Sequence, residues 1–124
     1  MVKISREQFE RVVSLAIDSL QEKFKSKLNN VAIFVAEEPT AEQLKKIKLR
    51  DGSGLFGLFE GYAQGRKLNF GPVLPDRITI FRRSILNHQS SIRGVENEII
   101  ATVRHEIAHH FGSDEQGAAK AGES

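Results

Sequence analysis

Two histidines and a glutamate close to the C-terminus, His105, Glu106 and His109, have the spacing H-E-x-x-H. Residues four apart on an α-helix share a face, so both imidazoles can bind the same ion. In zinc hydrolases with this pattern, the glutamate lies beside the coordinated water as a general base. Gly112 follows seven residues after His105, with acids just beyond it, which makes the pattern more specific than its five-residue core. The motif therefore predicts hydrolysis assisted by Zn²⁺.

The residues around the motif divide into a polar and an apolar helix face. At about 100° per residue, Thr102 and Glu98 share the side of the two histidines. Apolar residues occupy the opposite side: Ile99, Val103 and Ile107. We therefore expect one face to pack in a core while the histidines face a cleft or solvent. The alternative is a solvated polar face whose histidines lie near a helix end and interact with its dipole.

The third metal ligand stays open between two acids, Asp114 and Glu115. In one branch of H-E-x-x-H enzymes the residue ten positions after the first histidine completes the site, which here is Glu115. A carboxylate can replace the third imidazole and leave a fourth position for water. Alternatively, both acids are ordinary tail residues and Gly112 is only a helix cap. His110 lies about 100° from His109 around the helix, so we expect it to pack near the site rather than to bind the ion.

Length and composition narrow the class of protein. The 124 residues fit one domain over 1–124, and the absence of cysteine excludes disulfides and thiolate metal sites. The longest apolar run, Val31 to Ala36, is too short to span a membrane, and the N-terminus has no signal-peptide core. The net charge is +2, and the basic cluster from Lys45 to Arg50 fits a solvated helix face better than a nucleic-acid site. We expect a cytoplasmic monomer without a nucleic-acid or membrane partner.

The chain reads as alternating helices and strands without a linker or a repeat. Ser5 with Gln8 forms a capping box that begins a long amphipathic helix over 6–28. Thr40 with Gln43 can cap a second, short helix, and the motif helix spans 91–111. Three segments have the composition of strands: 31–36, 55–62 and 77–82. The tail over 116–124 is rich in glycine, alanine and charged residues, and we expect it to fray.

A glycine pattern in the middle of the chain resembles a nucleotide-binding fingerprint. Gly52, Gly54 and Gly57 match G-x-G-x-x-G, but that fingerprint needs a strand before it and a helix after it. Here a lysine-rich segment precedes the glycines and a strand-like segment follows them. We interpret the glycines as residues of a turn and a strand bend.

With the motif and these segments together, the chain resembles the small bacterial zincin-like metallopeptidases, also described as neutral zinc metallopeptidases. The resemblance covers most of the chain and rests on four segments: L-N-N-V-A-I-F-V-A-E-E-P, L-F-G-L-F-E-G-Y, L-P-D-R-I-T-I-F-R and T-V-R-H-E-I-A-H-H-F-G. It implies an α+β fold: a compact zincin-like domain whose small mixed sheet packs with a long N-terminal helix and a C-terminal active-site helix. It also implies that His105 and His109 bind zinc and that Glu106 is catalytic.

The sequence departs from the family pattern after Gly112. Family members usually have G-x-S-D-E, whereas this chain has Gly112, Ser113, Asp114 and Glu115 in succession. Alignment of the motif therefore favours Asp114 as the third ligand, while simple spacing favours Glu115. The C-terminal helix expected after the acids is replaced by a poor helix former. Met1 is the single methionine, which excludes the Met-turn of the metzincin branch.

The resemblance implies amide hydrolysis of a peptide or protein substrate. An extended peptide could pair with a free strand edge, which is either Leu55–Tyr62 or Arg77–Arg82. Possible oxyanion partners besides zinc are polar residues outside the motif: Tyr62, Arg66 and His88.

Two other classes of function stay open. One is a non-catalytic zinc-binding or regulatory domain that has kept the motif but lost turnover. The other is a metal-dependent RNA hydrolase with H-x-x-x-H-x-x-G-x-D-H, but that motif has a third histidine and lacks a glutamate at the position of Glu106.

Overall fold

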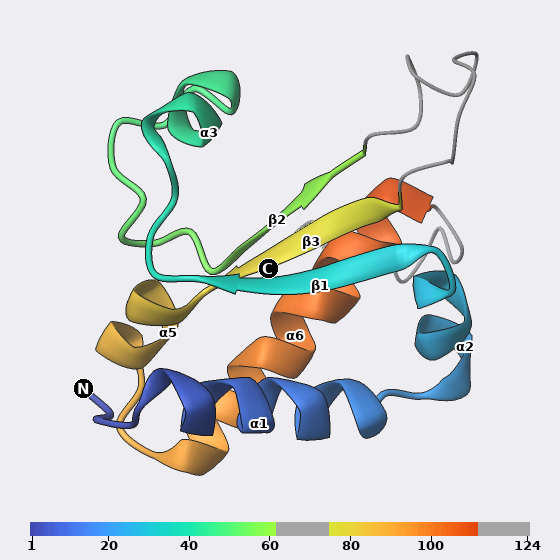
Figure 1. Cartoon of the computed structure of the whole chain (residues 1–124), viewed down its shortest axis with the longest axis horizontal. Coiled ribbons are helices and arrows are strands. Elements are labelled where there is room, and N and C mark those ends of the chain that lie inside the picture. The colour runs from blue at the N-terminus through green and yellow to red at the C-terminus, as the bar shows by residue number, and fades with distance from the viewer. Residues whose placement is uncertain (62–74, 112–124) are drawn as a thin grey trace.

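Three strands form a mixed sheet in the computed structural model, which describes residues 1–61 and 75–111 (Figure 1). The strands are β1 (Val31–Ala36), β2 (Gly57–Glu60) and β3 (Asp76–Phe81), in the order β1-β3-β2. β3 pairs in parallel with β1, with Ile33 opposite Ile78, and antiparallel with β2, with Phe59 opposite Ile78. β3 is therefore the central strand, and the expectation that Arg77–Arg82 could offer a free edge was wrong. β2 is an edge strand.

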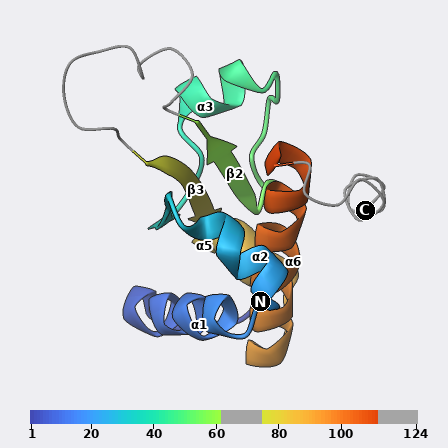
Figure 2. The same ribbon diagram turned by 90° about the vertical axis from the view of Figure 1, so that its right-hand side faces the viewer.

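Helices surround this sheet and make the fold α+β, as expected from the resemblance. They are α1 (Arg6–Asp18), α2 (Glu22–Lys25), a 3-10 turn η1 (Ser26–Leu28), α3 (Ala41–Lys46), α5 (Arg82–His88) and α6 (Ile92–Phe111). Figure 1 shows α1 and α6 on one side of the sheet, with α3 standing apart above it. In the view of Figure 2, the last turns of α6 run alongside β2. The motif helix thus lies next to the edge strand.

The N-terminal helix is shorter than the apolar spacing predicts. The capping box of Ser5 and Gln8 is present, but α1 ends at Asp18. The hydroxyl of Ser19 donates to the carbonyl of Ala16 at 2.8 Å, and Gln21 is extended, so the chain turns before α2. Residues 6–28 are therefore not one continuous helix. Because serine competes for backbone partners, it favours a helix end over a helix interior.

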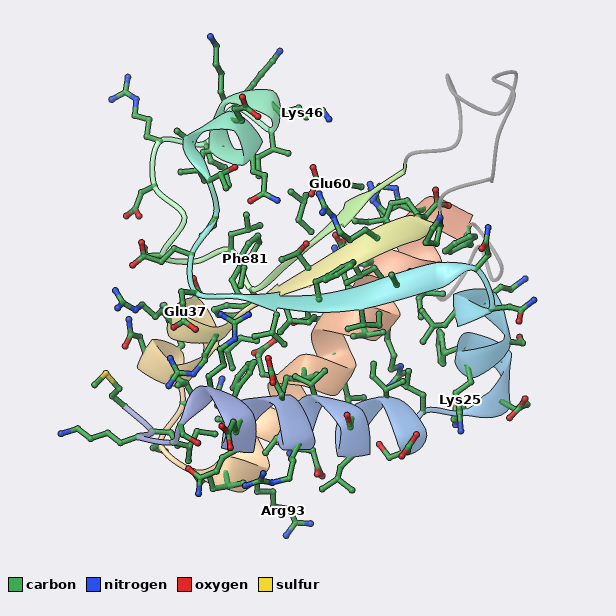
Figure 3. The ribbon with its side chains drawn as sticks, in the orientation of Figure 1. Lys25, Glu37, Lys46, Glu60, Phe81 and Arg93 are labelled. Carbon is green, nitrogen blue, oxygen red and sulfur yellow. The ribbon has the colours of Figure 1, made fainter. Side chains whose placement is uncertain are left out.

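The chain passes directly from β3 into α5, a helix that the sequence analysis did not predict. Phe81, the last residue of β3, is fully buried and precedes the first helical residue, Arg82. Arg82 donates through Nη1 to Glu37 at 2.6 Å and through Nη2 to the carbonyl of Ile4. Figure 3 shows Glu37 just beyond β1, near the start of α5. These bonds join the N-terminal segment, the end of β1 and the end of β3.

The apolar face of α6 is the centre of the core. Ile99, Val103 and Ile107 are 0% exposed, as the helical spacing predicts. They belong to one cluster with α1 residues and with Ile78 and Ile80 of β3. Because this face is held in the core, the opposite face of the helix must point toward β2 and solvent. Among the helices that the structure describes, none combines the length and the apolar character needed to cross a membrane.

Truncation of the core face should destabilise the protein far more than truncation of the histidine face. We expect Ile107→Ala to cost about 2–4 kcal/mol of unfolding free energy through the cavity that it leaves. Metal-free His105→Ala should cost about 0.5 kcal/mol or less. Urea denaturation in the presence of a chelator measures both values. Equal losses in the two variants would contradict this orientation of α6.

Candidate metal centre

The two motif histidines lie one turn apart on α6 and line the same cleft. The imidazole rings of His105 and His109 are nearly parallel, with 6.1 Å between their centroids and 9° between their planes. His105 is half-buried and His109 is exposed, so both rings are within reach of an ion from solvent. The helix itself brings them together, as the spacing predicts; their role as ligands stays a prediction.

Glu106 is held by the backbone of the edge strand. Its side chain is buried, with the residue 9% exposed, and its Oε1 accepts a hydrogen bond of 2.9 Å from the Phe59 N–H. Backbone groups alternate sides along a strand. The carbonyl of Phe56 accepts from the Phe81 N–H, so the N–H of Phe59, three residues on, faces away from β3 and toward α6. One carboxylate oxygen is therefore held by the sheet, and this fixes the orientation of the Glu106 carboxylate.

The helix and the edge strand approach most closely at a glycine. A Cβ atom at Gly57 would lie 2.5 Å from Cγ2 of Thr102 and 3.3 Å from the carbonyl oxygen of Thr79. No side chain fits in that space, so the close approach of α6 to β2 depends on glycine. The Thr102 hydroxyl donates to Glu98 at 3.2 Å, which further restricts the threonine. The third glycine of the G-x-G-x-x-G pattern begins strand β2, so a strand stands where the nucleotide-binding fingerprint requires a helix.

His110 packs on the edge strand and also lies edge-on to His109, with 4.8 Å between the centroids of the two rings. Its ring stacks on that of Phe59, with a centroid separation of 4.3 Å and an interplanar angle of 17°. Burial lowers the pKa of His110 below its ordinary value, and the nearby Glu106 carboxylate only partly opposes this effect. His110 therefore packs on Phe59 at the lining of the cleft, and the expectation that it is not a metal ligand stays a prediction.

Together β2 and α6 bound a cleft of about 800 Å³. Apolar side chains from the β2 segment and from the end of α3 form one wall: Ile47, Leu55, Phe56 and Leu58. The other wall is the polar face of α6. A hydrogen bond of 2.8 Å from Gln43 to Glu60 joins α3 to β2, and Arg77 donates to the same carboxylate oxygen at 3.3 Å. Figure 3 shows Glu60 between α3 and the sheet, so this contact ties α3, and with it Ile47, to the edge strand.

Several residues singled out from the sequence lie outside the described residues or outside the cleft. Asp114 and Glu115, the two candidates for the third ligand, and Tyr62 and Arg66 all fall outside the described residues. Over residues 1–61 and 75–111, no group of three or more possible ligand side chains gathers. His88 lies on α5, where its Nδ1 is 2.7 Å from the carbonyl oxygen of Ser84, and it does not line the cleft.

The donors present fit a zinc ion. Zinc accepts imidazole nitrogen and carboxylate oxygen, and catalytic sites use three protein ligands with one open position. Two imidazoles project into the cleft from successive turns of one helix, and the chain continues from α6 directly into the segment that contains the two acids. The sequence analysis did not identify Phe59 or Gly57 as part of the site. The glycine at position 57 could have indicated the contact with α6, since a glycine inside a strand often marks a close backbone approach.

A family model described as "Zincin-like metallopeptidase" matches residues 28–122, which is most of the chain and includes the whole motif. No curated protein matches the chain.

The contact between Gly57 and Thr102 should be detectable as an energetic coupling. We expect Gly57→Ala to cost about 1–3 kcal/mol of stability because its methyl group overlaps Cγ2 of Thr102. Thr102→Ser removes Cγ2, so the double variant should be more stable than the sum of the two single changes. Urea denaturation of the wild type, the two single variants and the double variant gives the coupling free energy of this double-mutant cycle. Strictly additive losses would show that α6 and β2 are not in close contact at this point.

Proposed function

Because the chain belongs to the zincin-like metallopeptidase family, we propose that this cleft is the active site of a zinc-dependent peptidase. The observation that carries the proposal is the buried carboxylate of Glu106, held by the Phe59 N–H between two histidines that line the same cleft. A glutamate that served only a solvated helix face would gain nothing from burial, since burying a charge costs free energy unless it is hydrogen-bonded.

Each residue of the motif has a distinct part in the proposed reaction. His105 and His109 would hold the zinc, with Asp114 or Glu115 as the third ligand. Bound zinc lowers the pKa of a coordinated water and polarises the scissile carbonyl. Glu106 takes a proton from the attacking water at Oε2 and later passes it to the leaving amine. Phe59 keeps the carboxylate in place through its N–H, which holds Oε1.

The edge of β2 is the proposed binding site for the peptide backbone. By the alternation of backbone groups, the carbonyl of Phe59 and both backbone groups of Gly57 lie on the edge that is not paired with β3. An extended peptide can add to such an edge through main-chain hydrogen bonds. The scissile carbonyl would then lie near Glu106, because Phe59 contacts that residue.

We expect one zinc per chain, bound through the histidine pair. His105→Ala combined with His109→Ala should remove the metal, whereas His88→Ala, a histidine on α5 outside the cleft, should retain it. Elemental analysis of dialysed protein gives the stoichiometry. Of Asp114→Asn and Glu115→Gln, the change that weakens zinc affinity identifies the third ligand. An unchanged stoichiometry in the double histidine variant would refute the site.

Replacement of the general base should separate metal binding from catalysis. We expect Glu106→Gln to keep stoichiometric zinc and to lower peptide hydrolysis by about 100- to 10,000-fold, the usual contribution of a general base. The matched control is Glu96→Gln, on the same helix but outside the cleft, which should retain activity. Casein and a broad peptide library serve as substrates. Full activity of Glu106→Gln would contradict the mechanism, and zinc-loaded wild type without activity on any substrate would favour a non-catalytic zinc domain.

A further inference from the structure

A second carboxylate lies in the same cleft, and the proposed reaction does not use it. Glu98 is half-buried on α6 and lines the cleft two turns before His105. Its hydrogen bonds come from neutral groups: the Thr102 hydroxyl at 3.2 Å and the Gln89 amide at 3.5 Å. Within the part of the chain that the structure describes, no lysine or arginine forms an ion pair with Glu98.

The surroundings of Glu98 favour a cation from outside the protein. The described side chains that line the cleft include two carboxylates, Glu98 and Glu106, and neither lysine nor arginine. A half-buried carboxylate without a counter-ion is incompletely compensated for its lost hydration. The lining of the cleft also includes Leu55, Phe56 and Leu58, whose apolar groups can pack along the aliphatic part of a long side chain. An aliphatic stem that ends in a positive charge, as in lysine or arginine, matches both walls.

The direction of the strand indicates which substrate residue would reach Glu98. Gly57 lies against Thr102 and Phe59 against Glu106, so β2 and α6 run in the same direction. Antiparallel pairing is the more stable kind per residue. A peptide paired antiparallel with β2 would therefore run from Glu106 toward Thr102 and Glu98. The residues that follow its scissile bond would lie on the Glu98 side.

The distance along the helix suits a long side chain. Glu98 precedes His105 by seven residues, which corresponds to about 10 Å along the helix axis. Helical side chains lean toward the N-terminus, so the metal side of the cleft and the Glu98 carboxylate are separated by roughly this distance. A short side chain after the scissile bond would leave the carboxylate unpaired, whereas the four-carbon stem of lysine extends toward it.

We propose that Glu98 is a specificity-determining residue that selects peptides with lysine or arginine directly after the scissile bond. This inference rests on the proposed peptidase function and goes beyond it by naming the substrate class. The ion pair would form in a cleft that is partly closed to water, so its effect should exceed that of a fully exposed pair.

The test compares matched peptides that differ only at the residue after the scissile bond: lysine, arginine, norleucine or glutamate. For the zinc-loaded wild type, we expect kcat/KM for lysine to exceed that for norleucine, its uncharged counterpart, roughly tenfold, as for hydrogen bonds to a charged group. Glu98→Gln should bring this ratio close to one, and Glu98→Lys should favour the glutamate peptide. Glu96→Gln, which removes a carboxylate outside the cleft, should keep the wild-type ratio.

Control peptides test whether the charge must come from the residue after the scissile bond. A binding assay tests the role of Glu98 even if no peptide is hydrolysed. Peptides with the lysine before the bond, or with a free instead of an acetylated N-terminus, should gain no preference that depends on Glu98. Binding of the lysine and norleucine peptides to Glu106→Gln, with and without Glu98→Gln, tests the same pair without turnover. Hydrolysis without a lysine preference, or a preference that survives Glu98→Gln, would overturn the inference while leaving the peptidase intact. If no peptide is hydrolysed, the binding comparison still decides on Glu98.

Discussion

The hydrogen bond from the Phe59 N–H to the Glu106 carboxylate joins the motif helix to the edge of the sheet, and the site is arranged around it. It can form because β2, among the strands that the structure describes, pairs on one side with β3, so the Phe59 N–H on its other side can donate to a side chain. A carboxylate buried at 9% exposure would otherwise carry a large desolvation cost. The bond holds Oε1, so one interaction stabilises the fold and orients the proposed general base.

The two faces of α6 explain why the cleft lies where it does. Ile99, Val103 and Ile107 hold one face in the core, which fixes the rotation of the helix about its axis. The opposite face can approach β2 only where both partners are small enough, as at Gly57 beside Thr102. Around that contact the two elements bound an open cleft, with Glu98 before Thr102 along the helix and the two histidines after it. Packing on one side of the helix therefore determines which side chains face a substrate on the other.

Local patterns in the sequence predicted much of this arrangement. Both capping boxes, the strand Val31–Ala36 and the core face of α6 follow from local residue chemistry, and the structure confirms them. The break after Asp18 and the junction at Phe81 were not predicted, because they depend on contacts with distant segments such as Glu37. The bond between Phe59 and Glu106 joins residues 47 positions apart, so the residue periodicity within β2 or within α6 could not predict it. The third ligand stays a prediction, since Asp114 and Glu115 lie outside the described residues.

The most direct test of the account is anomalous diffraction at the zinc edge from crystals of the zinc-loaded protein. We expect a single strong peak in the cleft, about 2.1 Å from one ring nitrogen of His105 and one of His109. The same map should place Glu106 outside bonding distance of the ion, with Oε1 still accepting from the Phe59 N–H. A zinc peak remote from the histidine pair, or a Glu106 oxygen bound directly to the metal, would contradict the central claim.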